Sequence, residues 1–240
     1  MNTCPVVIPV VIPVVIPVAD HGVLVVFDDQ ISDETRARVH ALDAALTRNP
    51  PAGLSEIVPA MTTLLVVFDP LVTDHAAISA AVHDSLNAPY TTSCGAAHVI
   101  DVCYDREHAP DLPALAARAG IDTEAAVAAH LAGAYTVGMY GFAPGYAYLY
   151  GTPESIQQPR RPTPGPLVPA GSVIIAGQQC LIIPVAMSTG WFAIGRSAAL
   201  MYTADHDKPF LFDVGDTVTF RRIDAVDLEA RLDGQQVAPR

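Results

Sequence analysis

The first part of the chain alternates apolar runs with helical patterns. Residues Gly22–Phe27 (GVLVVF) form an apolar run that predicts a β-strand. Asp33 then offers an N-cap to a helix, and helical spacing places Val39, Leu42 and Leu46 on one face. The pattern therefore predicts a strand followed by an amphipathic helix.

A second unit of the same kind follows. Residues Ser55–Val58 and Thr62–Phe68 are predicted to form short strands, Asp69 and Pro70 a turn, and Asp74 the start of a helix with apolar residues four apart. The resulting order of strand, helix, strand, strand and helix is typical of a small α+β domain. In such a domain the helices cover one face of a mostly antiparallel sheet.

The remainder of the chain is mainly β. A strand over Ala97–Tyr104 precedes two short helical patterns, Asp111–Ala119 and Thr123–Leu131. Beyond Tyr135 the pattern consists of short β-rich runs separated by Gly and Pro clusters, with few helical positions. This spacing predicts a closed or nearly closed β-barrel. The expected domains are an α+β domain over residues 19–90 and a mainly-β barrel domain over residues 91–240.

Residues 1–18 contain three copies of VVIP, so that Pro recurs at positions 9, 13 and 17. A Pro at every fourth position forbids a regular helix and leaves an extended or polyproline-like chain. The stretch is too short for a membrane span. We expect an appended low-complexity tail without a catalytic role. The alternative is an edge-seeking β segment, because Val and Ile favour extended structure.

Composition narrows the classes of partner. The chain carries 25 acidic residues against 13 Lys and Arg, a formal net charge of -12. This charge repels nucleic acid and anionic membrane surfaces, so neither is an expected partner. The cysteines show no CxxC pair and no zinc-site spacing, and the N-terminus does not resemble a secretory signal. We therefore expect reduced thiols, no metal site and a cytoplasmic protein.

Several common catalytic motifs are absent from the sequence. The chain holds a single lysine, Lys208, and no GxxxxGK segment, which excludes a P-loop. It has no GxSxG, HExxH or strand-linked GxGxxG motif either. Any nucleotide must therefore be held by other means or by another subunit.

Candidate functional residues cluster in the predicted barrel. The turn Gly141–Tyr146 (GFAPGY) would let backbone approach a ligand closely, although a barrel corner is an equally good interpretation. Arg160 and Arg196 could each offer a bidentate guanidinium to a carboxylate or phosphate, but lone arginines are more often solvated surface groups. His130 could act as a general base and Gln179 could orient an amide, yet both are more often structural.

A string of motifs gives the sequence a family resemblance. GFAPGYAYL is followed in order by PRR, VPAGSVIIAG and GWFAIGR, and SEIVPA, LLVVFDP and VCYDREHAPDL lie upstream. On these motifs the chain, from Ala19 to Phe220, resembles the 5-oxoprolinase B subunit family, also called KipI or PxpB and formerly allophanate hydrolase subunit 1. The resemblance implies a small α+β N-terminal domain and a cyclophilin-like C-terminal barrel.

The resemblance also implies functional residues. The matching positions are the catalytic candidates His130, Arg160, Gln179 and Arg196, and the substrate-binding candidates Phe142, Pro144, Gly145, Tyr146, Gly190 and Trp191. Two departures from the family pattern concern the expected site. Gly165 stands where relatives usually carry a second arginine, and Cys180 replaces a threonine.

In function, the resemblance implies the B subunit of an ATP-dependent 5-oxoprolinase. Such an enzyme opens the ring of 5-oxoproline to glutamate, together with a C-type subunit and a LamB-type subunit. The ATP site is then shared with or supplied by a partner, and the isolated chain is expected to be inactive. Two alternatives stay open: a KipI-like inhibitor that binds a histidine kinase, and a carboxyl-transfer component of a urea carboxylase or allophanate system.

Overall fold

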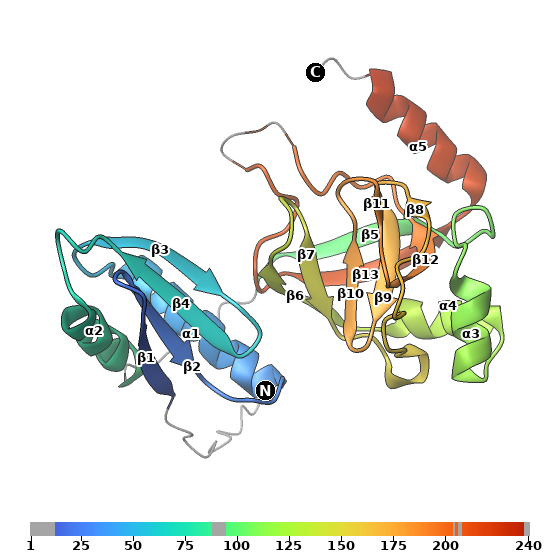
Figure 1. Cartoon of the computed structure of the whole chain (residues 1–240). Helices are drawn as coiled ribbons and strands as arrows, with labels where there is room; N and C mark the ends of the chain where they lie inside the picture. The colour runs from blue at the N-terminus through green and yellow to red at the C-terminus, as the bar shows by residue number, and fades with distance from the viewer. Residues whose placement is uncertain (1–12, 88–94, 204, 206–207, 238–240) are drawn as a thin grey trace, which may run out of the picture. The chain divides into compact units, whose positions relative to one another are not determined.

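The computed structural model describes residues 13–87, 95–203, 205 and 208–237 (Figure 1). The chain divides into two compact units, residues 1–93 and 94–240. Each unit has its own hydrophobic core. The domain boundary that we expected between residues 90 and 91 lies outside the described residues.

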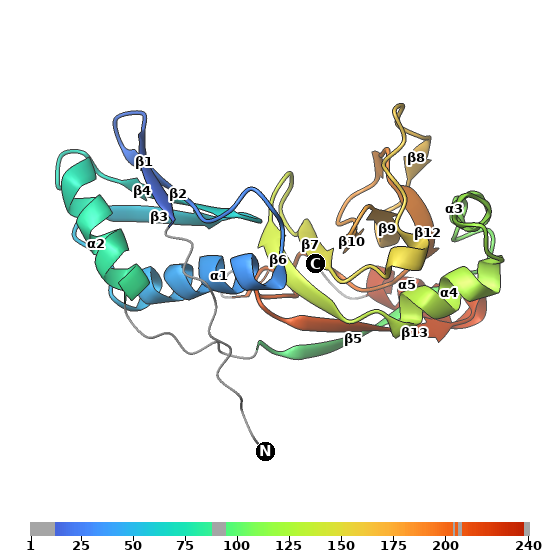
Figure 2. The ribbon, with the colours of Figure 1, turned by 90° about the horizontal axis from the view of Figure 1, so that it is seen from below.

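The N-terminal unit is an antiparallel sheet with α1 and α2 on one face (Figures 1 and 2). The strands lie in the order β1-β2-β4-β3, and each neighbouring pair is antiparallel. Along the chain the elements are β1 (Val14–Val18), β2 (Gly22–Val26), α1 (Asp33–Arg48), β3 (Leu54–Pro59), β4 (Thr63–Phe68) and α2 (His75–Asn87). The predicted α+β unit is thus confirmed.

Helix α1 begins one residue away from the expected cap. Ser32 has an extended backbone, and its Oγ accepts a hydrogen bond from Thr35 N at 3.0 Å. Ser32 is therefore the N-cap, and Asp33, which we expected in that role, is the first helical residue. The three apolar positions that the spacing placed on one face of α1 are buried in the core of this unit.

The last VVIP copy belongs to this sheet, which corrects the expectation of a tail for the residues that form β1. Val14–Val18 pair antiparallel with β2. Pro13 is buried, and Val15 packs against the core of the unit. The edge-strand alternative holds here because β-branched side chains gain burial beside β2 that a solvated chain would lack. Residues 1–12 lie outside the described residues.

The backbone nitrogens of Pro13 and Pro17 point away from β2. Phe27 N donates to Thr62 O at 2.9 Å, so the odd-numbered residues of β2 form their hydrogen bonds toward β4. Hydrogen bonds of a central strand alternate between its two neighbours, so the even-numbered residues of β2 bond β1. The even-numbered residues of β2 pair with even-numbered residues of β1. The backbone nitrogens of the odd-numbered Pro13 and Pro17 therefore point outward, away from β2. Because the proline nitrogens do not face β2, their lack of an N–H group leaves the hydrogen bonds between β1 and β2 intact.

The C-terminal unit is a closed barrel with the strand order β10-β7-β6-β13-β5-β12-β9. β5 and β13 run parallel, and the other neighbouring pairs are antiparallel. Its elements are β5 (Ala97–Cys103), α3 (Leu112–Ala119), α4 (Thr123–Ala132), β6 (Tyr135–Tyr140), β7 (Ala147–Tyr150), the 3-10 helix η1 (Glu154–Ile156), β8 (Leu167–Val168), β9 (Ser172–Ala176), β10 (Gln179–Ile182), β11 (Met187–Ser188), β12 (Phe192–Arg196), β13 (Thr217–Ile223) and α5 (Ala225–Val237). The predicted mainly-β barrel is confirmed.

Helix α5 was not predicted from the sequence. It begins after Asp224, whose Oδ1 accepts a hydrogen bond from Asp227 N at 2.8 Å. Leu228 is buried, but most of its described side chains are exposed, so the apolar repeat is too sparse to reveal a helix. Neither α5 nor any other helix in the described ranges is long and apolar enough to cross a membrane.

Strands β9, β10 and β12 bury both of their faces. In β9, Val173 and Ile175 point into the barrel core, whereas Ile174 and Ala176 belong to a second apolar cluster outside the barrel. This outer cluster also contains Tyr146, Val168, Leu181, Ile183, Trp191 and Ala193. Burial on both faces explains why these strands appear in the sequence as continuous apolar runs. The outer cluster carries the candidate site.

The pairing of β1 leads to a prediction about truncation. Deleting residues 1–17 removes most of β1 and uncovers the edge of β2, so we expect the free energy of unfolding of the N-terminal unit to fall by roughly 2–4 kcal/mol. Deleting residues 1–12 keeps β1 and should change it by less than about 0.5 kcal/mol. Urea unfolding followed by circular dichroism measures both. Equal stability of the two truncated proteins would contradict a structural role for β1.

Candidate functional site

An aromatic row crosses the outer cluster of the barrel. Ring centroids of Phe142 and Tyr146 lie 5.1 Å apart, those of Tyr146 and Tyr148 5.2 Å, and those of Tyr148 and Trp191 6.1 Å. The rings come from the β6–β7 turn, from β7 and from the residue before β12. Tyr146 and Tyr148 share the outer face because side chains alternate along a strand. Tyr146 and Trp191 are buried, and the exposed parts of the row, on Phe142 and Tyr148, are where a flat ligand can stack.

Arg160 lies beside this row. A Cβ built on Gly190 would lie 3.6 Å from its Nε, so the guanidinium sits against the segment that leads into Trp191. Burial raises the pKa of Tyr146 to about 12, and the nearby charge of Arg160 opposes this rise. The same charge acts on Tyr148, whose pKa burial also raises. Arg160 is exposed and forms no ion pair within the described ranges, so its donors face solvent.

Arg161, the next residue, has a structural role. Its Nη1 donates to Asp111 Oδ1 at 2.7 Å, its Nη2 to Trp191 O at 2.9 Å, and its backbone N to Gly190 O at 2.7 Å. Asp111 Oδ2 in turn accepts a hydrogen bond from Ala193 N at 2.9 Å. The ion pair thus joins the start of α3, the Pro-rich loop and the start of β12. It sets the positions of Arg160 and Trp191.

Gly165 lies against the Arg161 guanidinium. A Cβ built at Gly165 would lie 2.7 Å from Arg161 Nη2, closer than real side chains approach. Gly165 N also donates to Thr189 O at 2.8 Å. A side chain at position 165 would have to displace the guanidinium that holds the Trp191 segment.

The β6–β7 turn presents Phe142 to solvent. Phe142 has a φ of 69°, in the left-handed region that an aromatic residue rarely adopts, and 81% of the residue is exposed. Pro144 is exposed as well. Gly145 has a φ of 76°, and a Cβ there would lie 3.1 Å from Met201 O, so glycine is needed for the close approach. Strain of this kind often marks a binding site.

Gln179 lies on the same outer face as the aromatic row. It begins β10, pairs with Ala176 of β9, and shares its face with Leu181 by strand alternation. Its Nε2 donates to Tyr150 Oη at 3.2 Å. Gln179, Arg160, Gly190 and the aromatic row are thus carried by one side of four neighbouring strands, β7, β10, β9 and β12.

His130 lies on the opposite side of these strands, inside the barrel. It is fully buried, with Nδ1 2.8 Å from Tyr104 Oη and Nε2 3.5 Å from Cys180 Sγ, and its ring packs 4.4 Å from that of Phe220. Burial lowers the pKa of His130 to about 3 and raises that of the Cys180 thiol. His130 is therefore a neutral core residue, and Cys180 contacts it rather than the outer face.

Arg196 is also separate from the aromatic row. It ends β12, and its Nε donates to Ala170 O at 3.4 Å. Trp191 lies five residues earlier, at the other end of the strand, which at about 3.3 Å per residue is roughly 16 Å away. Arg160 and Arg196, which the motifs suggest together, thus occupy different ends of the barrel wall.

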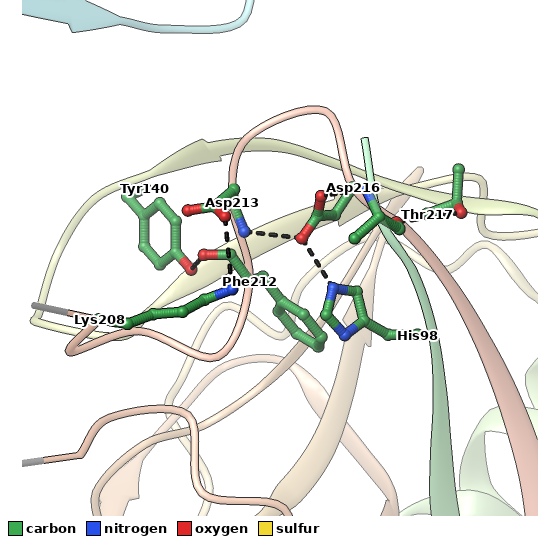
Figure 3. Close-up of polar contacts among 8 residues, drawn as sticks. His98, Tyr140, Lys208, Phe212, Asp213, Asp216 and Thr217 are labelled. Atoms are coloured by element: carbon green, nitrogen blue, oxygen red, sulfur yellow. Dashed lines mark hydrogen bonds and ion pairs between the residues drawn. The ribbon is translucent and has the colours of Figure 1, made fainter. Parts of the chain in front are cut away.

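A polar clamp that the sequence did not reveal supports the β6–β7 turn (Figure 3). His98 Nε2 lies 2.7 Å from Asp216 Oδ2, which also accepts a hydrogen bond from Asp213 N at 2.8 Å. Although burial favours the neutral acid, these hydrogen bonds lower the pKa of Asp216. Tyr140 Oη donates to Phe212 O at 2.7 Å and so attaches the end of β6 to the same loop. No sequence spacing links His98 to Asp216.

Comparisons agree with this architecture of a barrel and an adjoining α+β unit. Residues 13–212 match the family model of the carboxyltransferase domain, subdomain C and D. The 5-oxoprolinase B subunit of Bacillus subtilis (strain 168) is 31% identical over 226 residues, which cover 89% of this chain and 94% of that protein. The protein of the same name from Escherichia coli O157:H7 is 40% identical over 121 residues, 50% of this chain and 56% of that protein. The chain belongs to the 5-oxoprolinase B subunit family.

Solved structures show the same fold. TTHA0988 has a TM-score of 0.77 and 33% identity, covering 86% of this chain and 41% of that one, so this chain spans less than half the length of TTHA0988. PH0987 from Pyrococcus horikoshii is 32% identical with a TM-score of 0.53 and covers 90% of this chain and 100% of that one. The K. lactis urea amidolyase, with a TM-score of 0.68 at 15% identity, shares the fold alone.

The burial of His130 predicts a pH dependence of stability. The pKa of His130 is about 3 in the folded chain, whereas an unfolded histidine titrates near 6.5. Below about pH 6.5 the unfolded state binds a proton that the folded state does not, so stability falls as the pH falls, by roughly 1.4 kcal/mol per unit. Urea unfolding between pH 7.5 and 5 should show a steeper loss for wild type than for His130→Phe. Identical slopes would contradict a neutral buried histidine.

Proposed function

We propose that this chain is the B subunit of an ATP-dependent 5-oxoprolinase, which opens 5-oxoproline to glutamate with a C-type subunit and a LamB-type subunit. The observation that carries the proposal is the exposed Arg160 guanidinium beside the aromatic row. Two relatives that bear the name of a 5-oxoprolinase B subunit support the choice of substrate.

The substrate has two features that the outer face matches. 5-Oxoproline is a flat five-membered lactam with a carboxylate. The carboxylate suits the planar fork of Arg160, and the ring suits stacking on Tyr148, which is partly exposed. Because burial raises the pKa of both Tyr146 and Tyr148, their hydroxyls stay protonated at neutral pH and can donate hydrogen bonds. Gln179, on the same face, can orient the lactam amide.

In this proposal the steps of the ATP-dependent ring opening are divided between subunits. An unstrained amide is a poor electrophile, so ATP is proposed to activate the lactam oxygen. The sequence contains no P-loop, and we assign the ATP site to a partner or to a surface shared with one. His130, a neutral core residue, is not suited to act as the general base of the ring opening. That proton transfer is therefore assigned to a residue of a partner. This chain would bind and orient the substrate.

A second candidate function rests on Phe142. An exposed aromatic side chain held in a left-handed backbone suits recognition of a protein, as in a KipI-like inhibitor of a histidine kinase. Autophosphorylation of a candidate kinase distinguishes the two functions. An inhibitor lowers it in the presence of the purified chain, and an enzyme component leaves it unchanged.

The activity is tested by reconstitution. The chain mixed with C-type and LamB-type partner subunits should release phosphate and glutamate from ATP and 5-oxoproline.

In that complex we expect Arg160→Lys to lower kcat/KM about tenfold to a hundredfold, because an ammonium cannot reproduce bidentate binding of a carboxylate. Arg196→Lys is the matched control and should keep wild-type turnover. No turnover by the wild-type complex would refute the function, and equal loss in both variants would refute the site.

The strained turn gives a second prediction. Phe142→Gly should stay within about 1 kcal/mol of wild-type stability, because relief of the left-handed strain offsets the greater freedom of glycine in the unfolded chain. Binding to the C-type partner subunit or to the kinase should weaken more than about tenfold by calorimetry, because an aromatic contact is lost. Leu71→Gly, at an exposed loop residue of the other unit, is the control. Unchanged affinity of Phe142→Gly would remove Phe142 from the interface.

A further inference from the structure

The sheet of the N-terminal unit has an apolar face that α1 and α2 do not cover. Its buried residues Val23, Val25, Leu64 and Val66 belong to the core beneath the helices. The alternate positions must point to the other side of the sheet. The side chains on that helix-free face are those of Val14, Ile16, Val18, Leu24, Val26, Val58, Leu65 and Val67.

This face is unusual for an antiparallel sheet with helices on one side. The second face of such a sheet normally carries polar residues in contact with water. Here four of its residues remain substantially exposed, Val14 by 58%, Ile16 by 41%, and Val18 and Val58 by 39%. Among the strand residues, polar groups occur only at the rim of the described face, with Glu56 in β3 and Thr63 at the start of β4. A contiguous aliphatic face of this kind indicates an interface.

The β1 edge of the same sheet disfavours the addition of a partner strand. The backbone nitrogens of Pro13 and Pro17 point outward from β1 and carry no hydrogen. An added strand would therefore find few hydrogen-bond donors there. Strand addition at the β1 edge is therefore disfavoured, whereas the aliphatic face beside it remains accessible. Pro13 and Pro17 lie four positions apart, so both fall on the same outer side of β1.

We propose that the helix-free face packs against the same face of a second copy of this chain, around a two-fold axis. Each copy carries a formal charge of -12, so two copies can meet only where the surface carries little charge, and the charged strand residue of this face is Glu56 at its β3 edge. An aliphatic face is its own complement and needs no matching polar groups across the axis. Two such sheets stack about 10 Å apart with interdigitated side chains.

The size of the face suits a dimer. Four strands spaced about 4.8 Å apart, each of about five residues at roughly 3.4 Å, give a face of roughly 300 Å². Two copies hide roughly 600 Å² of aliphatic surface, which with a polar rim of similar size reaches the ~1,200 Å² of small specific interfaces. The self-association does not depend on the proposed activity.

Sedimentation velocity over a range of concentrations tests the dimer with a matched pair of variants. Ile16 on the face and Ile31 in the loop before α1 are both 41% exposed. We expect wild type and Ile31→Glu to dimerise. Ile16→Glu should raise the dimer dissociation constant at least about a hundredfold, because the two-fold axis buries the new carboxylate in both copies.

Val58→Glu, from the far edge of the same face, repeats the test if Ile16→Glu fails to fold, as judged by circular dichroism. Loss of the dimer in a folded face variant supports the proposal. A wild-type chain that stays monomeric overturns it, whether or not a different protein then binds the face. A dimer that survives both face substitutions overturns it as well.

Discussion

The alternation of side chains along each strand is the constraint on which both units depend. In the N-terminal sheet, one face of β2 and β4 packs on the helices, and the other face is largely aliphatic and carries no helix of this unit. In the barrel, the inner face of β9 fills the core, and the outer face carries the candidate site. A shift of one residue in register would exchange the two faces of a strand. Register therefore sets the core and the functional surface together.

Arg160 and Arg161 show how neighbouring residues of one type take different roles. Arg161 directs its donors to Asp111 and to the carbonyl group of Trp191, and it stacks over Phe192 at 5.3 Å. This partly buried pair ties the Pro-rich loop to β12 and holds Arg160 beside the aromatic row. A guanidinium whose own donors remain in solvent can bind an anion only if its backbone is held in place by such a neighbour.

The two histidine environments separate structure from chemistry. His130 is neutral and enclosed by Tyr104, Cys180 and Phe220, and His98 is paired with Asp216 in the clamp that supports the β6–β7 turn. The outer face instead carries phenol hydroxyls of raised pKa, an amide and a guanidinium. Such groups bind and orient a substrate, and they do not exchange protons near neutral pH. This composition supports the proposed binding role beside a catalytic partner.

Local patterns in the sequence determined most of the secondary structure and the α+β and barrel units, because hydrophobic period and turn residues act over a few positions. The family resemblance came from the string of motifs. The motifs also supplied Phe142, Tyr146 and Trp191 of the aromatic row as candidate residues, but not Tyr148. The pattern could not place β1 in the sheet or separate Arg160 from Arg196 and His130, since these depend on which face and which end of a strand a residue occupies. His98 and Asp216 lie 118 positions apart and meet only because the barrel closes β5 against β13. Long-range pairing of this kind leaves no local signal, so only the tertiary structure decided it.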